Sequence, residues 1–145
     1  MSGRRDIGRL QAEIEELFSD LWQVPRFTGA RHGFRPAVDC YRTNDPPALT
    51  LVIELAGVDP AGVEVVAVDR AVVVSGVRRR PDAVQGQVYQ QIEIEYGRFQ
   101  RHIPLPVDVD TSAAKATYEQ GLLTVVLPIA EKPAGPVQVP VDVRS

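Results

Sequence analysis

The spacing of apolar residues divides the chain into three regions with different predicted structures. Between Asp6 and Trp22, apolar side chains recur at intervals of three or four positions, which predicts one amphipathic helix of about four turns. The residues on its apolar face are Ile7, Leu10, Ile14, Leu17, Phe18, Leu21 and Trp22. Pro25 marks the end of this helix, and the residues after it, which include Phe27 and Phe34, show no period. We therefore assign residues 1–35 to an N-terminal arm.

From residue 36 the pattern changes to short runs of β-branched residues separated by Gly, Pro, Asn and Asp, and 21 of the 22 valines follow Arg35. The candidate strands are Val38–Tyr41, Leu49–Leu55, Val63–Val68, Ala71–Ser75, Val88–Ile92, Arg98–Ile103, Ala113–Tyr118 and Leu122–Leu127. Short strands without helices between them predict an all-β domain, an antiparallel β-sandwich or barrel, over residues 36–128. We expect Val65 and Ala67 to share one face of their strand, and Val66 and Val68 to share the other.

Two segments interrupt or follow this domain. Residues 76–87 contain Arg78, Arg79, Arg80, Pro81 and Gly86, and they are predicted to form a long exposed loop. Residues 129–145 are rich in proline and end in valines at every odd position from 137 to 143. This composition predicts an extended tail with little packing of its own. Its alternating valines would expose apolar surface to water, which indicates a groove elsewhere that receives them.

Charge and hydropathy exclude several functional classes. The chain has 16 basic and 19 acidic side chains, a net charge of −3, which gives no general electrostatic reason to bind nucleic acid or an anionic membrane. The three consecutive arginines lack a flanking aromatic platform, so we expect a solvated loop there. No apolar run approaches the roughly 18 residues of a membrane span, and the N-terminus is not typical of a signal peptide. A soluble cytoplasmic protein is therefore expected.

Catalysis and cofactor binding find little support. His32 and His102 are isolated and Cys40 is the only cysteine, so neither a catalytic triad nor a tetrahedral metal site is expected. Glu93 and Glu95 would share one face of a strand, where a solvated face or an ion pair is the expected role. The glycines are too scattered for a nucleotide-binding loop. We expect no enzyme, no cofactor and no metal, and a buried, inert thiol at Cys40.

Four motifs carry a resemblance to a known family. An aromatic residue, a Glu, a Gly-x-Phe-x-Arg sequence and Leu-Pro occur in order as Tyr89, Glu93, Gly97, Phe99, Arg101, Leu105 and Pro106. The other motifs are Leu55-Ala56-Gly57-Val58, the stretch from Ala116 to Gly121-x-Leu123, and Val139-Pro140-Val141. In this order and spacing, the chain resembles the small heat-shock proteins of the bacterial type, which contain an α-crystallin domain.

The resemblance implies an immunoglobulin-like sandwich and an ATP-independent chaperone that holds unfolding client proteins. It implies a homodimer in which the strand around Val88–Gln91 crosses to the partner, with Tyr89, Glu93 and Arg101 in the interface. It also implies a larger homo-oligomer, linked by Val139, Pro140 and Val141 in a groove of a neighbouring dimer. Client contacts would come from the apolar residues of the arm, namely Ile7, Leu10, Ile14, Leu17, Phe18, Leu21, Trp22, Phe27 and Phe34.

Several alternatives stay open at this point. Without the resemblance, Arg101 would be interpreted as an exposed strand residue. In a second alternative, the valine tail is a frayed end. In a third, the apolar helix packs permanently against the sandwich or against its copies. A β-sandwich co-chaperone of the CS-domain type shares the architecture but acts as an adaptor to another chaperone, and it would need neither the helix nor the valine tail.

Overall fold

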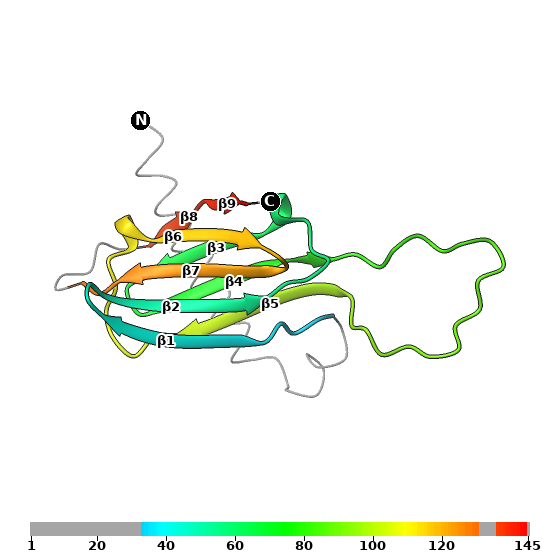
Figure 1. Cartoon of the computed structure of the whole chain (residues 1–145), viewed down its shortest axis with the longest axis horizontal. Helices are drawn as coiled ribbons and strands as arrows, with labels where there is room; N and C mark the ends of the chain where they lie inside the picture. Colours follow the sequence, from blue (N-terminus) through cyan, green and yellow to red (C-terminus); the bar gives the residue numbers. More distant parts are fainter. Residues whose placement is uncertain (1–32, 131–135, 145) are drawn as a thin grey trace.

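The computed structural model describes residues 33–130 and 136–144, which form two β-sheets packed face to face (Figure 1). This arrangement confirms the predicted β-sandwich. The amphipathic helix predicted for residues 6–22 lies outside the described residues, as do all the expected client-binding residues except Phe34.

Among the described residues, the strand order is β1-β2-β7-β6-β9 in the first sheet and β5-β4-β3-β8 in the second. The strands of the first sheet are β1 (Val38–Asn44), β2 (Pro47–Glu54), β6 (Lys115–Glu119), β7 (Leu122–Pro128) and β9 (Val141–Val143). Those of the second are β3 (Glu64–Val68), β4 (Ala71–Arg78), β5 (Gly97–Pro104) and β8 (Val137–Val139). The 3-10 turns η1 (Pro60–Gly62) and η2 (Thr111–Ala113) precede β3 and β6. Neighbouring strands are antiparallel, except that β9 runs parallel to β6.

The core lies between the sheets and contains every second residue of the central strands, because successive side chains of a strand point to opposite faces. Leu51 and Ile53 of β2 meet Val65, Val72 and Val74 of the opposite sheet, and all of these are fully buried. Val65 and Ala67 face the core, whereas Val66 lies outside the core cluster, as the alternation predicts. Burial of these aliphatic side chains is the main stabilising term, at roughly 1.5–3 kcal/mol for each fully buried Val, Leu or Ile.

The arginine-rich loop begins later than predicted. β4 continues through Gly76 to Arg78, which pairs with Gly97 of β5. Gly76 makes this pairing possible, because a Cβ there would lie 2.8 Å from Cζ of Phe99, a buried core residue. The loop therefore spans residues 79–96, and the prediction that it starts at Gly76 is wrong.

The predicted strand at Val88–Ile92 is also wrong for the single chain, since this segment lies within the loop and has no strand structure. An extended segment becomes a strand only when its backbone groups pair with a neighbour. Figure 1 shows the loop extending away from the sandwich, so no other described strand lies alongside it.

The tail differs from the prediction as well, because it packs on its own sandwich. β8 pairs with β3 and β9 pairs with β6, so the tail extends both sheets (Figure 1). Val139 is only 3% exposed and belongs to the core cluster. The expectation of little packing is wrong because the backbone groups of two edge strands were available for pairing.

Cys40 is exposed, so the expected buried thiol is wrong. It lies on β1, an edge strand on which only Val38 is partly buried. Partial desolvation still raises the pKa of the Cys40 thiol. The protonated thiol is the weaker nucleophile, so this shift lowers the reactivity of the side chain.

The hairpin between β6 and β7 offers a test of the fold. Its two loop residues, Gln120 and Gly121, have φ values of 54° and 78°, as a type I′ turn requires. We expect Gly121→Ala to lower the free energy of unfolding by about 1–2 kcal/mol, because the left-handed conformation disfavours a Cβ. The new Cβ would also lie 3.1 Å from the Cα of Ala56.

Urea denaturation of the full chain measures this difference. The control is Gly62→Ala, because a Cβ at Gly62 meets no atom within 4 Å and its φ is not positive. Equal midpoints for the two variants would contradict the turn assignment.

Candidate functional site

The loop of residues 79–96 presents apolar side chains to solvent, far from the sandwich core (Figure 1). Its large exposed apolar residues are Val84, Val88, Tyr89, Ile92 and Ile94. Val88 is 74% exposed and Ile92 is 61% exposed. Apolar residues grouped on a projecting segment mark a surface that binds another molecule.

Arg78 joins the two ends of the loop at its root. Its guanidinium lies 3.6 Å from the ring centroid of Phe34 and 5.6 Å from that of Tyr96. It also donates hydrogen bonds from Nε and Nη2 to the carbonyl oxygen of Glu95, near the end of the loop. The ring of Phe34 in turn packs edge-to-face on Phe99 in the core, with centroids 5.5 Å apart.

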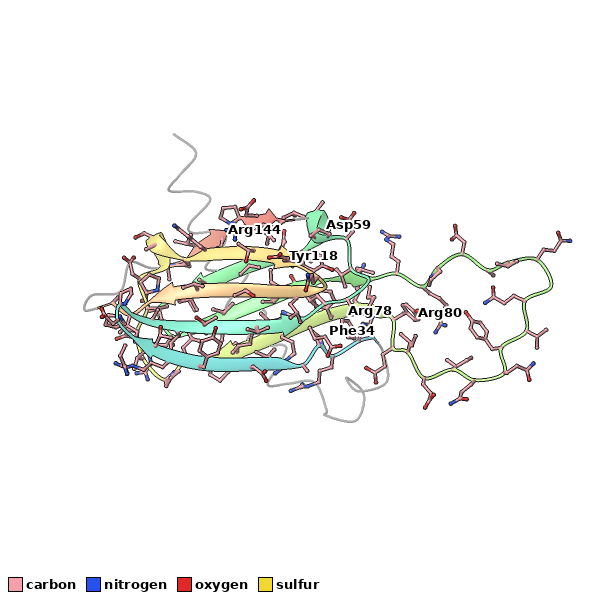
Figure 2. All side chains as sticks on the ribbon, in the orientation of Figure 1. Phe34, Asp59, Arg78, Arg80, Tyr118 and Arg144 are labelled. Carbon is pink, nitrogen blue, oxygen red and sulfur yellow. The ribbon has the colours of Figure 1, made fainter. Side chains whose placement is uncertain are left out.

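Arg80 also stacks on aromatic rings, further from the sandwich than Arg78. Its guanidinium lies 4.6 Å from the ring centroid of Tyr96 and 5.5 Å from that of Tyr89, and Nη1 donates to the Tyr89 hydroxyl at 3.3 Å. Figure 2 shows Phe34, Arg78 and Arg80 in sequence from the sandwich to the loop. Five residues make up what we call the arginine–aromatic stack: Phe34, Arg78, Arg80, Tyr89 and Tyr96.

Arg79 and Arg80 are exposed, as a solvated loop predicts, but the aromatic contacts of Arg78 and Arg80 were not expected from the sequence. The aromatic residues lie 9 to 44 positions away from their arginine partners in sequence, so local inspection missed them.

Arg101 lies on the inner face of β5, at the side of the sandwich where the edge strands β5 and β1 face each other. Its position opposite Val74 points it inward, and its Nη1 donates to the carbonyl oxygen of Pro36, just before β1. Burial, and after it the positive charge of Arg35, lowers the pKa of Arg101. A guanidinium is always charged, so this position links the two edges by a charge-assisted hydrogen bond.

The other expected interface residues are not beside Arg101 within one chain. Tyr89 binds Arg80, and Glu93 accepts a hydrogen bond from the side chain of Gln91, both in the projecting loop. A contact between these loop residues and Arg101 would therefore need a second chain.

The tail links the two sheets along one side of the sandwich. Val139 pairs with Val65 of β3, and Val141 pairs with Ala116 of β6, with Pro140 exposed between them. The backbone N–H of Arg144 donates to the carbonyl oxygen of Tyr118 at 2.9 Å. Figure 2 shows Arg144 and Tyr118 on this side of the molecule. The register that the alternating valines left open in the sequence is thus set by β3 and β6.

Little in the described residues suggests reaction chemistry. Within residues 33–130 and 136–144, no group of three His, Cys, Asp or Glu side chains is placed to hold a metal ion. Burial lowers the pKa of His102, which favours the neutral imidazole. No helix in this part of the chain is long and apolar enough to cross a membrane.

Comparison with known proteins identifies one family. The model of the Hsp20/alpha crystallin family matches residues 42–143. A rice 19.0 kDa class II heat shock protein is 40% identical over 86 residues, which cover 55% of this chain and 49% of the rice protein. Alpha-crystallin of Mycobacterium bovis is 33% identical over 92% of this chain and 88% of its own length. Heat shock protein 16 of Schizosaccharomyces pombe is 30% identical over 82% and 85%.

Solved structures agree with these sequence matches. Heat shock protein 16.0 of Schizosaccharomyces pombe superposes with a TM-score of 0.61 at 28% identity, covering 68% of this chain and 90% of that one. A small heat-shock protein of Xylella fastidiosa gives 0.58 at 30% identity, covering 74% and 98%. The similar proteins come from plants, a fission yeast and bacteria.

The arginine–aromatic stack predicts a local effect on the loop. We expect Arg78→Lys to speed amide hydrogen exchange at residues 95–97 about tenfold, because Lys lacks the planar fork that both stacks on Phe34 and binds the Glu95 carbonyl. Exchange followed by mass spectrometry measures this rate, with Arg79→Lys, an exposed neighbour outside the stack, as the control. Identical exchange in both variants would show that the stack does not hold the loop.

Proposed function

Because this chain belongs to the Hsp20/alpha crystallin family of small heat-shock proteins, we propose that it is an ATP-independent chaperone that binds unfolding proteins and prevents their aggregation. Members of this family are chaperones without enzymatic activity, so the chain is not an enzyme. The observation that carries the proposal is the match of the family model to residues 42–143, which include the sandwich, the loop and the tail strands. Holding by binding needs no chemical step, because any species that binds the unfolded chain lowers its free concentration.

The proposed first level of assembly is a homodimer formed by exchange of the loops. The segment Val88–Ile92 is exposed, carries the large side chains of Val88, Tyr89 and Ile92, and has no strand partner among the described residues. β1 is an edge strand and leaves one row of backbone groups unpaired. Addition of the loop segment of one chain to β1 of another would satisfy both. Tyr89 and Glu93 would then approach the β1–β5 side, where Arg101 lies.

The proposed second level uses the tail. Val139, Pro140 and Val141 dock in the groove between β3 and β6, and in the single chain this groove holds the chain's own tail. Exchange of tails between dimers would keep the same hydrogen bonds and the same burial of Val139, so intrachain and interchain docking are close in energy. The family is generally oligomeric and binds client proteins, which supports this assignment.

The proposed client-binding surface is the apolar face of the N-terminal arm. Unfolding proteins expose apolar side chains, and burying a methylene group against another apolar surface contributes about 0.8 kcal/mol. The arm offers seven such residues on one helical face, together with Phe27 and Phe34. Phe34 is the member with a defined position, where its ring lies under Arg78.

The arm assignment predicts the behaviour of variants of the full chain. We expect Leu17→Ser combined with Leu21→Ser to reduce the suppression of client aggregation several-fold, because two apolar side chains leave the client-binding face. Light scattering of a heated client protein measures this. Glu13→Ser combined with Glu16→Ser, on the polar side of the same helix, is the matched control. Undiminished suppression by the leucine variant would remove the arm from the proposal.

The loop assignment predicts the mass in solution. We expect Ile92→Asp to weaken the dimer at least tenfold, since a carboxylate would replace an apolar contact at the partner's sheet edge. Static light scattering should then show a shift towards the monomer mass of 15.9 kDa. The control is Val84→Asp, in the same loop but outside the pairing segment. If neither variant shifts the mass, or the unmodified protein is already a monomer, loop exchange is not the basis of assembly.

A further inference from the structure

Leu55, the residue directly after β2, is held by the hairpin of β6 and β7. Its N–H donates to the carbonyl oxygen of Gly121 at 2.8 Å, and its carbonyl oxygen accepts from the Tyr118 hydroxyl, also at 2.8 Å. A longer bond of 3.3 Å from the N–H of Val58 reaches the same carbonyl. The Leu55 side chain is fully buried in the core cluster, against which Tyr118 packs. The position of Leu55 therefore depends on where the hairpin holds Tyr118.

The tail fixes Tyr118 from its other side. Tyr118 pairs with Val143 of β9, and its carbonyl oxygen accepts from the backbone N–H of Arg144 at 2.9 Å. Without β9, β6 would be the edge strand of the first sheet, with no partner on that side among the described strands. A strand that is paired on one side only opens more easily than one paired on both. Docking of the tail therefore restrains the residue whose hydroxyl holds Leu55.

The next residue along the chain touches the root of the loop. The carbonyl oxygen of Ala56 accepts a hydrogen bond from Nη1 of Arg78 at 3.4 Å. The same guanidinium binds the carbonyl oxygen of Glu95 and stacks on the ring of Phe34. Figure 2 shows Tyr118 and Arg78 at the same end of the sandwich. Arg78 thus links the turn after β2, residues 55–57, to the end of the loop. We call residues 55–57 the coupling turn.

The coupling turn is packed between the hairpin and Arg78. A Cβ at Gly121 would lie 3.1 Å from the Cα and 3.2 Å from the Cβ of Ala56, so the hairpin loop already lies against the turn. On its other side, a Cβ at Gly57 would lie 3.9 Å from Cδ of Arg78. Closely packed groups transmit a displacement because they have little room to deform. A shift of the hairpin is therefore passed on to Arg78.

We propose that Tyr118 and Arg78 are positioning residues that couple occupancy of the tail site on β6 to the order of the loop root. When the tail is docked, Tyr118 holds the carbonyl of Leu55, and Ala56 meets Arg78. When the tail site is empty, Tyr118 moves with the unpaired edge strand, the coupling turn shifts, and Arg78 loses one of its supports. The end of the loop at Glu95 then opens more often.

This inference rests on the proposed two levels of assembly and deepens them. An ordered loop loses less conformational entropy when it pairs with another chain, so a filled tail site favours the dimer. A coupling between two binding events is reciprocal, so formation of the dimer favours a filled tail site to the same extent. Either the chain's own tail or that of another copy fills the site. The two levels of assembly therefore strengthen and weaken together.

Amide hydrogen exchange of the full chain tests the coupling in both directions. Val141→Asp places a carboxylate where the tail packs on the core, and we expect it to speed exchange about threefold at residues 95–97 as well as in the tail. In the other direction, Arg78→Lys should speed exchange about threefold at residues 142–144. Arg79→Lys is the matched control and should leave the tail unchanged. Unchanged exchange at the distant site in both Val141→Asp and Arg78→Lys would overturn the proposal.

Exchange at residues 124–126 separates coupling from general loss of stability. These residues lie in β7, between β2 and β6, so their amides are exposed chiefly by global unfolding. We expect no change there in any of the variants. Equal acceleration at residues 124–126 and at the distant site would overturn the proposal, because it would show that the whole sandwich had been destabilised.

Tyr118→Phe tests the route, because it removes only the hydroxyl that binds the carbonyl of Leu55. We expect it to speed exchange at residues 95–97, and we expect Val141→Asp to add no further change there in the Tyr118→Phe chain. Tyr41→Phe, at a tyrosine of β1 that is 51% exposed, is the control and should have no effect. A full effect of Val141→Asp in the Tyr118→Phe chain would assign the link to contacts between copies and overturn the proposed route.

These outcomes are distinct from failure of the proposed function, which the client-aggregation assay measures separately. A protein that suppresses aggregation while its tail and loop exchange independently keeps the function and loses the coupling. A protein with coupled exchange and no suppression keeps the coupling and loses the function.

Discussion

The backbone groups at the edges of the two sheets are the constraint from which the other features of this structure follow. Without the tail, the sandwich has β3 and β6 as edge strands on one side and β5 and β1 on the other. Each edge carries donors and acceptors that gain a partner only by the addition of another strand. The tail adds β8 and β9 to the first pair of edges and so closes that side. No described strand of the chain pairs with the other side.

Two arginines make contacts on or near the open side. Arg101 connects β5 to the segment before β1, and Arg78 anchors the loop through Phe34, which packs on Phe99. The loop thus leaves the sandwich in a defined direction despite its length. A loop that already has a defined direction loses less conformational entropy when it pairs with another chain than a freely moving loop would. This smaller loss favours association.

The two sides also differ in how easily they exchange partners. The tail is tied to the sandwich by short strands and one deeply buried valine, a set of contacts that another copy of the tail reproduces without new chemistry. The loop is held by stacked side chains at its root while its apolar segment stays exposed. In the assembly proposed above, tail docking would be suited to reversible linkage, and loop pairing to a more permanent unit.

Alternation along the strands determined most of the sandwich from sequence alone. Each valine-rich run folds as a strand, and Val65 and Ala67 face the core because the period of two leaves an apolar sheet no other way to bury one face. The turn residues Gln120 and Gly121 likewise set their hairpin, since few residues adopt a positive φ. These features depend on the backbone conformation that each residue prefers and on the burial of apolar side chains. Both can be read from residues that are close together in the sequence.

Features that join distant residues were decided only by the tertiary structure. The stacking of Arg78 on Phe34 joins positions 44 apart, and the pairing of the tail with β3 depends on an edge that no local pattern reveals. The segment Val88–Ile92 has the composition of a strand and is not one, because a strand needs a neighbour and residues 33–130 and 136–144 supply none. Sequence therefore determined which residues are buried, whereas the fold decided which edges are closed, because backbone pairing depends on what lies alongside.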